Sequence, residues 1–231
     1  MTTRCEPATV DELVRARRST RAYLDRPVDP VMLRELLSTA ARAPSGGNLQ
    51  PWQLFVLANE ALAQFKSVIG ERVRVAPKGE DPEYSVYPSP LPELYAQRRF
   101  ECGEALYALL EIPRTDKARR RGQFADNFAF FGAPVGLFCF VDRRMGAPQW
   151  ADLGMFLQTL MLLLKTRGID TCAQEAWSLY PRTVCAYVSA PAELMLFCGM
   201  AIGYADPHAP INRLQTPRAP VEQFSTFLGF P

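Results

Sequence analysis

The segment APSGGNLQPW, residues 43–52, contains two prolines, two glycines, Ser45 and Asn48 within ten positions. Pro44 ends the helical pattern before it, because proline lacks the amide hydrogen that a helix interior needs. The serine, glycines and asparagine then place small hydrogen-bonding groups on a backbone that a ligand can approach closely. An ordinary turn has the same composition, so the segment indicates a binding site only together with other parts of the chain.

Helix start signals lie on the N-terminal side of this segment. Thr9 followed by Glu12 is a capping-box pattern, and it predicts a first helix over about residues 10–17. Asp29 and Pro30 predict the start of a second helix, since aspartate caps exposed amides and proline suits the first turn. Apolar residues then repeat on one helical face until the segment begins.

Apolar runs dominate the C-terminal part of the chain. A near-continuous apolar helix is expected over about residues 152–165, with Gly168 after its end. Three other apolar runs are bounded by turn formers and predict buried strands, at residues 54–57, 134–141 and 194–204.

The stretch from Gly70 to Pro92 differs from its surroundings, with five prolines among charged residues and tyrosines. No periodic element is expected there. A long ordered loop in a compact domain is more often a lid or binding loop than a passive connection. A disordered linker is the alternative, but the flanking parts have too few strands to stand alone. We therefore expect one domain over residues 1–231, with a lid or insertion at about residues 70–125.

The overall charge restricts the possible partners. With 26 basic and 24 acidic residues, the net charge of +2 gives no broad positive field, so nucleic acid and anionic membranes are not expected as partners. The N-terminus carries charges where a secretory peptide needs an apolar stretch. The longest apolar run, residues 153–164, is too short to cross a bilayer. The expectation is a cytoplasmic protein.

The chain has a single histidine, His208, and six scattered cysteines without a C-x-x-C pair. Histidine-based metal clusters, Ser-His-Asp triads and Cys-His pairs all need an imidazole held beside a partner. His208 lies in a proline-rich segment instead and is expected to be a solvated loop residue. We therefore predict no metal site and no catalysis that depends on a histidine, and we expect reduced cysteines.

Arg17, Arg18 and Arg21 place three guanidiniums within five positions, at the end of the first predicted helix. Such charges repel one another unless an anion or carboxylates neutralise them, and guanidinium forks suit phosphate oxygens. The favourable interaction of arginine with a helix C-terminus is an alternative explanation for the cluster.

The arginine segment and the segment at residues 43–52 indicate a function more clearly together than either does alone. RRSTR at residues 17–21, followed by APSGGNLQPW, resembles the paired FMN-binding signature of the nitroreductase family at that family's spacing. The form QEAW at residues 174–177 is most similar to the branch that acts on nitroaromatics such as nitrobenzoates. The resemblance covers nearly the whole chain, is weakest across residues 70–125, and continues in DLGMFLQTLML at 152–162, GIDTCAQEAW at 168–177, GYAD at 203–206 and RAP at 218–220.

The resemblance implies the family's fold and cofactor. The fold would be α+β, with a mainly antiparallel central sheet flanked by helices, in an intertwined homodimer with exchanged termini. FMN would be bound tightly but non-covalently between the two subunits. The apolar helix expected at residues 152–165 would lie in the subunit interface, which would explain why it lacks a polar face.

The resemblance also implies roles for individual residues. The phosphate end of FMN would be held by Arg17, Arg18, Ser19, Arg21 and Arg218. The flavin ring would be contacted by Pro44, Ser45, Gly46 and Asn48 of the second subunit, by Asp152 near the ring edge, and by Gln174, Glu175 and Ala176, a loop whose backbone N–H faces the ring nitrogen that receives hydride.

The implied activity is that of an NAD(P)H-dependent FMN nitroreductase, an enzyme in which the flavin carries the difficult electron chemistry. In a ping-pong cycle, NADH or NADPH would reduce FMN, and a small electron-poor acceptor, most simply a nitroaromatic compound, would then take the electrons. A quinone or enone reductase, a reductive dehalogenase or a flavin-fragmenting synthase of the same family are alternatives. Outside enzymes, the alternative is a flavin-binding sensor or storage protein.

Substrate contacts are predicted for Trp177, Tyr95 and Arg98. These two aromatic rings, like those of the lid tyrosines Tyr84 and Tyr87, offer faces on which a flat acceptor can stack. Arg98 or its neighbour Arg99 could pair with a substrate carboxylate. Internal packing for the aromatic rings and surface salt bridges for the arginines are the ordinary alternatives.

Overall fold

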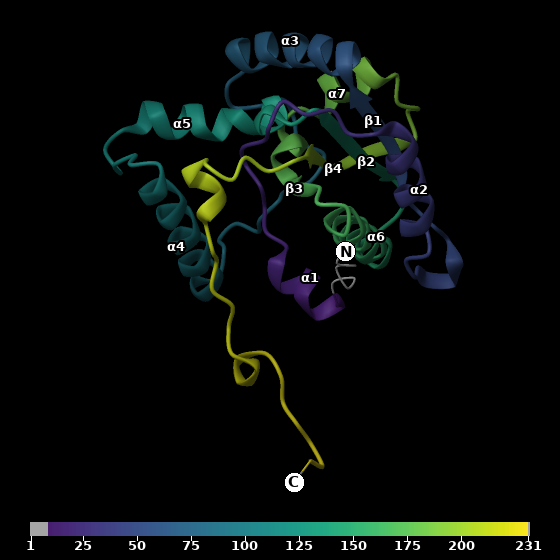
Figure 1. The fold of residues 1–231 in the computed structure, drawn as a ribbon, viewed down its shortest axis with the longest axis vertical. Helices are drawn as coiled ribbons and strands as arrows, with labels where there is room; N and C mark the ends of the chain where they lie inside the picture. Colours follow the sequence, from purple (N-terminus) through teal and green to yellow (C-terminus); the bar gives the residue numbers. More distant parts are fainter. Residues whose placement is uncertain (1–8, 231) are drawn as a thin grey trace, which may run out of the picture.

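The structure, a computed structural model, describes residues 9–230 and contains one four-stranded sheet with helices around it (Figure 1). Each neighbouring pair of strands is antiparallel, and the strand order is β1-β2-β4-β3. This confirms the expected α+β class with an antiparallel sheet. The strands are β1 (Gln53–Ala58), β2 (Val135–Asp142), β3 (Asp170–Gln174) and β4 (Leu194–Gly203).

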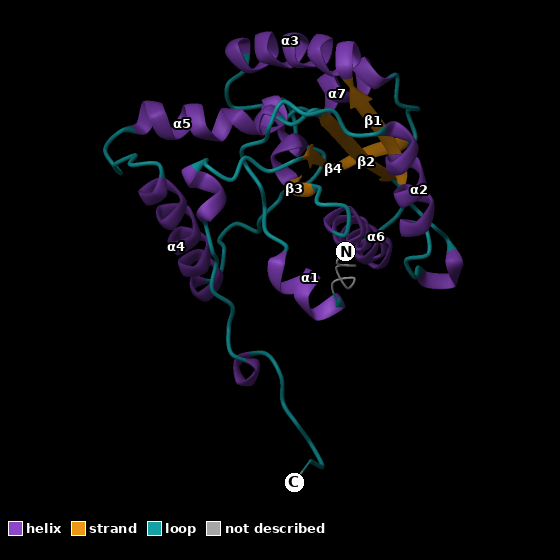
Figure 2. Ribbon diagram, viewed as in Figure 1, coloured by secondary structure: helices purple, strands orange, loops and turns teal. Residues whose placement is uncertain are grey.

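Figure 2 shows the helices in purple around the orange strands. The first two helices begin where the sequence supplies caps. The Thr9–Glu12 capping box is formed at the start of the first helix, and the Asp29 side chain accepts a hydrogen bond from the amide of Val31 at the start of the second. The α-helices are α1 (Val10–Ala16), α2 (Pro30–Ala40), α3 (Asn59–Val75), α4 (Glu93–Leu109), α5 (Lys117–Ala125), α6 (Ala147–Lys165) and α7 (Pro181–Val188).

Both faces of the sheet are buried. Alternate residues of β2 point to opposite sides and therefore belong to two separate core clusters. Leu137 and its alternate neighbours pack with buried residues of α2 and α6. Phe138 and Phe140 pack on the other face with buried residues of α3 and α7. A strand covered on both sides needs apolar residues at every position, which explains the continuous apolar run of β2.

Several elements differ from the predicted set. The structure adds α3, α4, α5, α7 and β3. The expectation of no periodic element between Gly70 and Pro92 is wrong at its start, because α3 continues to Val75. The rest of the predicted insertion, to about residue 125, contains the helices α4 and α5. Helix α6 begins five residues before position 152, since Pro148 in its first turn is compatible with helix initiation. Among residues 9–230, no helix is both long and apolar enough to cross a membrane.

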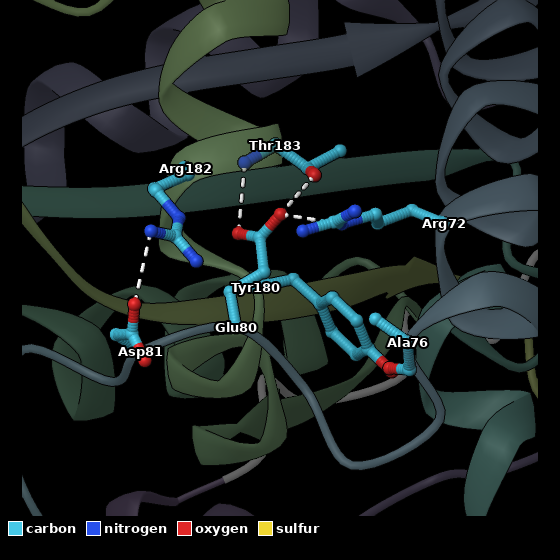
Figure 3. A network of polar contacts seen from close by, with 7 residues as sticks. All are labelled: Arg72, Ala76, Glu80, Asp81, Tyr180, Arg182 and Thr183. Carbon is cyan, nitrogen blue, oxygen red and sulfur yellow. Dashed lines mark hydrogen bonds and ion pairs between the residues drawn. The ribbon is translucent and has the colours of Figure 1, made fainter.

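The loop after α3 is anchored to the N-terminus of α7 by a polar network (Figure 3). The carboxylate of Glu80, whose side chain is 2% exposed, accepts hydrogen bonds from Arg72 Nε at 2.8 Å and from the amide and hydroxyl of Thr183 at 3.0 and 2.6 Å. The Tyr180 hydroxyl donates to the carbonyl of Ala76 at 2.8 Å. Burial alone would raise the pKa of Glu80, but the bonds from Thr183 and Arg72 outweigh it and lower that pKa. These bonds therefore hold the first residues of the loop, from Ala76 to Glu80, in place against α7.

Candidate functional site

The arginine segment lies along the edge of β3. Ser19 forms a parallel bridge with Thr171, and the amide of Thr20 donates to the carbonyl of Thr171 at 3.0 Å. The amide of Arg21 donates to the side chain of Asn212 at 2.8 Å, so the C-terminal part of the chain holds the segment from its other side. These bonds fix residues 19–21 beside the end of the sheet and use none of the arginine side chains.

The three guanidiniums in this segment have no carboxylate partner among residues 9–230. Arg18 donates to the carbonyl of Asn212 at 2.9 Å, and Arg21 donates to the carbonyl of Ser19 at 3.3 Å. Burial raises the pKa of the Cys172 thiol, while the positive charges of Arg21 and Arg17 oppose this rise, so both guanidiniums lie within electrostatic reach of β3. Clustered positive charge without a counter-charge suits a phosphate.

A cavity of about 810 Å³ lies beside this segment, and Arg21 is the one of its three arginines that lines it. Its volume is in the range of known sites for cofactors and small ligands. One wall is formed by Arg21, the end of β3 and the 3-10 turn η3 (Glu175–Leu179). The other walls come from the loop before α4, from α4 itself, from the end of α5 and from the 3-10 segment η2 (Asp126–Gly132).

The loop of Gln174, Glu175 and Ala176 lines this cavity. The side chain of Gln174 is buried, where its amide donates to the carbonyl of Asn127 at 2.8 Å and accepts from the indole of Trp177 at 3.2 Å. These bonds hold the loop in place. Glu175 is exposed in the cavity, where partial desolvation raises the pKa of its carboxyl.

Residues 44–48 lie elsewhere, next to α6, and none of them lines the cavity. The amide of Gly46 donates to the two carboxylate oxygens of the buried Asp152 at 3.2 and 3.3 Å. The hydroxyl of Ser45 accepts from the amide of Gln50 at 3.0 Å. Asn48, like the glycine before it, has a positive φ, a conformation that these two residue types adopt most readily. Within one chain, the residues predicted to bind FMN therefore lie in two separate places, one at the cavity and one next to α6.

Arg218 belongs to neither group in the structure. Its guanidinium donates to the carbonyl of Thr216 at 3.0 Å, to the hydroxyl of the same residue at 2.7 Å and to the carbonyl of Pro217 at 3.0 Å. The residue is exposed and does not line the cavity.

The predicted substrate contact of Trp177 is wrong. The indole is 0% exposed and packs among Phe65, Phe130 and Phe138. It also lies against the backbone of Gly199, where a Cβ atom would clash with the indole ring. The aromatic ring thus supports the loop before it from the core side, and no acceptor can stack on it.

Tyr95 and Arg98 lie on α4 but do not line the cavity. Tyr95 is exposed, and the guanidinium of Arg98 donates to the side chain of Gln223 at 3.1 Å. The cavity is instead lined by Tyr87 and Arg99, which the sequence offered beside these residues as possible contacts, and by Phe100, which it did not. For Phe100 the available signal was helical spacing, since it falls on the same face of α4 as Ala96 and Gly103.

No group of three or more metal-ligating side chains that could hold a metal ion is found within residues 9–230. His208, the one histidine, is exposed in a loop, as predicted. The arrangement has a cationic end, a fixed loop and aromatic walls. It is therefore suited to bind a planar, phosphorylated ligand.

Comparison with known proteins agrees with this geometry. The model of the nitroreductase family matches residues 14–204. The nitrobenzene nitroreductase of Ectopseudomonas oleovorans is 40% identical over 95% of this chain and 96% of its own length. The 4-nitrobenzoate reductase of Pseudomonas putida is 35% identical over 95% and 96%. The crystal structure of the FMN and NADPH-dependent nitroreductase NfnB from sphigopyxis sp. strain HMH superposes with a TM-score of 0.94 at 46% identity, over 96% of this chain and 100% of that one.

Proposed function

Because the chain belongs to the nitroreductase family, we propose that it is an FMN-dependent enzyme that uses NAD(P)H to reduce nitroaromatic compounds. The observation that carries this proposal is the cavity beside three guanidiniums that have no carboxylate partner among the described residues. The relatives named above are a nitrobenzene nitroreductase and a 4-nitrobenzoate reductase, and their similarity extends over 95% of the chain.

The residues present fit FMN. Arg21 lines the cavity, and Arg17, Arg18 and Ser19 belong to the same segment, so together they would supply positive charge and a hydroxyl for a phosphate at that end of the cavity. The loop at residues 174–176 lines the same cavity, where its backbone amides would lie beside a flat ring. When bound, FMN supplies the two-electron chemistry between the nicotinamide and the nitro group. The protein's own residues bind the phosphate, orient the ring and shape the acceptor site.

We propose further that two copies of the chain complete each site. Pro44, Ser45, Gly46 and Asn48 lie apart from the cavity of their own chain, as expected if they serve the cavity of a second copy. Because Asp152 bonds Gly46 within one chain, the carboxylate would come from the same subunit as this segment. The FMN would then lie between an arginine group from one subunit and a glycine-rich group from the other.

The C-terminal segment supports this assembly. It extends away from the body of the molecule (Figure 1), and its apolar side chains are strongly exposed, with Leu228 at 83%. Phe224, Phe227 and Phe230 are exposed with it. Contiguous apolar surface of this kind marks an interaction site. A second subunit is the occupant that an intertwined homodimer would place there.

The cytoplasm is the compartment that we propose for this protein. Five cysteines in the described part of the chain are free, and three of them, Cys139, Cys172 and Cys198, are buried. Buried thiols without disulfide partners are typical of proteins that work in a reducing compartment.

The proposal is tested by mixing FMN-loaded protein with NADH or NADPH without oxygen. The visible absorbance of the flavin should bleach with at least one of the two, and addition of nitrobenzene should restore it while the nitro compound is consumed. A protein that refuses FMN, or whose flavin is bleached by neither nucleotide, would rule out the proposed function. The bleaching step also distinguishes an enzyme from a flavin-binding storage protein.

A further inference from the structure

One face of α4 forms a wall of the cavity. Ala96, Arg99, Phe100, Gly103 and Tyr107 all line it, and their spacing of three and four residues places them on a single stripe of the helix. Arg98 is adjacent in sequence but about 100° away around the helix, so it reaches Gln223 instead. The fold thus selects one of the two neighbouring arginines for the cavity.

Arg99 has an aromatic face as its neighbour but no acidic partner. Its guanidinium carbon lies 4.5 Å from the centroid of the Tyr87 ring. Within residues 9–230, no carboxylate lies at ion-pair distance from it. A cation over a ring keeps its hydrogen-bond donors free around its edge, so Arg99 can still bind an anion.

The other charged residues of the cavity are either paired or located on a different wall. Glu104 forms an ion pair with Arg120, with two nitrogen–oxygen contacts. Arg21 lies with the predicted phosphate-binding arginines, and Glu175 follows β3. Arg99 is therefore the positive charge on the α4 wall that no carboxylate of the described chain neutralises.

The surfaces around Arg99 are aromatic. Five rings line the cavity, from the loop before α4, from α4, from α5 and from η2. Such walls favour a flat ring, and a cation beside them favours a negative substituent on that ring. The five are Tyr87, Phe100, Tyr107, Phe124 and Phe131.

We propose that Arg99 binds the carboxylate of an aromatic acceptor, so that the enzyme prefers nitroarenes with a carboxylate over uncharged nitroarenes. This inference rests on the proposed function and names the substrate class of the same site. The guanidinium can bind a carboxylate through two parallel hydrogen bonds, a geometry that a nitro group alone does not match in charge. A phosphate of the nicotinamide nucleotide offers similar chemistry, and the experiment must separate these two sources.

The test compares kcat/KM for 4-nitrobenzoate and nitrobenzene in the FMN-loaded wild-type protein, Arg99→Gln and Arg98→Gln. Arg99→Gln should lose about tenfold on 4-nitrobenzoate, the size of one charge-assisted hydrogen bond near solvent. Its value for nitrobenzene and its KM for NADH and NADPH should stay within about twofold. Arg98→Gln, the matched control on the other face of the helix, should behave like the wild-type protein with both acceptors.

An equilibrium measurement separates this inference from the proposed function. Benzoate, which cannot be reduced, should bind the FMN-loaded wild-type protein more tightly than Arg99→Gln by about the same factor, measured by calorimetry. Three results would overturn the role of Arg99. These are an equal loss of kcat/KM with both acceptors, a change confined to the KM for NADPH, and benzoate binding that is the same in the wild-type protein and in Arg99→Gln. If neither nitroarene is reduced while benzoate binding still depends on Arg99, the proposed activity fails and the anion site stands.

Discussion

Helices α6 and α4 have similar lengths, 19 and 17 residues, but different surroundings. Helix α6 buries six residues, among them Leu153 and Leu160, against the sheet and α2. Helix α4 buries none and leaves Phe100 45% exposed. Its inner stripe faces the cavity instead of the core.

This difference separates stability from binding. Burial of apolar surface stabilises the folded chain, so side chains of the core carry most of the unfolding free energy. The apolar side chains of α4 contribute little of it because water still reaches them. Their surface remains available to a ligand. Substitutions in the core should therefore change the stability, and substitutions on α4 should change the affinity for the acceptor.

The largest effect is expected in the aromatic core beneath the loop at residues 174–176. Trp177→Ala removes a fully buried side chain that contacts Phe65, Phe130 and Phe138, and it should lower the free energy of unfolding by about 3–5 kcal/mol. Chemical denaturation followed by circular dichroism measures this change. A loss below about 1 kcal/mol would show that this core is not tightly packed.

An intermediate effect is expected where the loop before α4 is anchored. Glu80→Gln keeps the shape of the buried side chain but removes its charge, and it should cost about 2 kcal/mol at pH 7. Asp81→Asn is the control, since Asp81 pairs with Arg182 in solvent at 2.9 Å and should change almost nothing (Figure 3).

The cost of Glu80→Gln should depend on pH. Because the folded-state pKa of Glu80 is lowered, its stabilising contribution is complete above the unfolded-state pKa of about 4.3 and is lost as the pH falls through the folded-state value. Melting temperatures of the two proteins should therefore differ at pH 7 and pH 5 and converge at lower pH. A constant difference across this range would show that the charge of Glu80 is not responsible.

The smallest effect on stability is expected on α4. Phe100→Ala should change the free energy of unfolding by less than about 0.5 kcal/mol, because the ring is nearly half exposed. The same substitution should raise the KM for nitrobenzene severalfold, since it removes one aromatic wall of the cavity. If stability falls as much as in Trp177→Ala, α4 belongs to the core and the contrast with α6 is wrong.

Strong local signals made much of the fold predictable from the sequence. The capping residues of α1 and α2 and the apolar runs of β1, β2 and β4 act over a few neighbouring positions, and the structure confirms them. Helix α4 gave no such signal, because its apolar residues face a cavity and solvent rather than a core. Strand β3 is short and mixes Asp170 and Thr171 with apolar residues, so its pairing with β4 decides its conformation.

The candidate site was likewise predictable from the sequence only in part. Resemblance to the family pointed to the arginine segment and to the loop at residues 174–176, and the structure brings Arg21 of that segment and the loop to one cavity. The contact between Gly46 and Asp152 joins residues 106 positions apart, which no local pattern can indicate. The choice between Arg98 and Arg99 depends on the rotation of α4 about its axis, which packing determines.

The most direct test of a site shared by two subunits is complementation between two inactive variants. Arg21→Ala damages the arginine group, and the double variant Ser45→Ala/Asn48→Gly damages the glycine-rich group while keeping a backbone that tolerates positive φ. Refolded together in equal amounts, the two variants should regain about a quarter of the wild-type activity, because each mixed dimer then has one intact site. A mixture that stays as inactive as its two components would contradict the shared site.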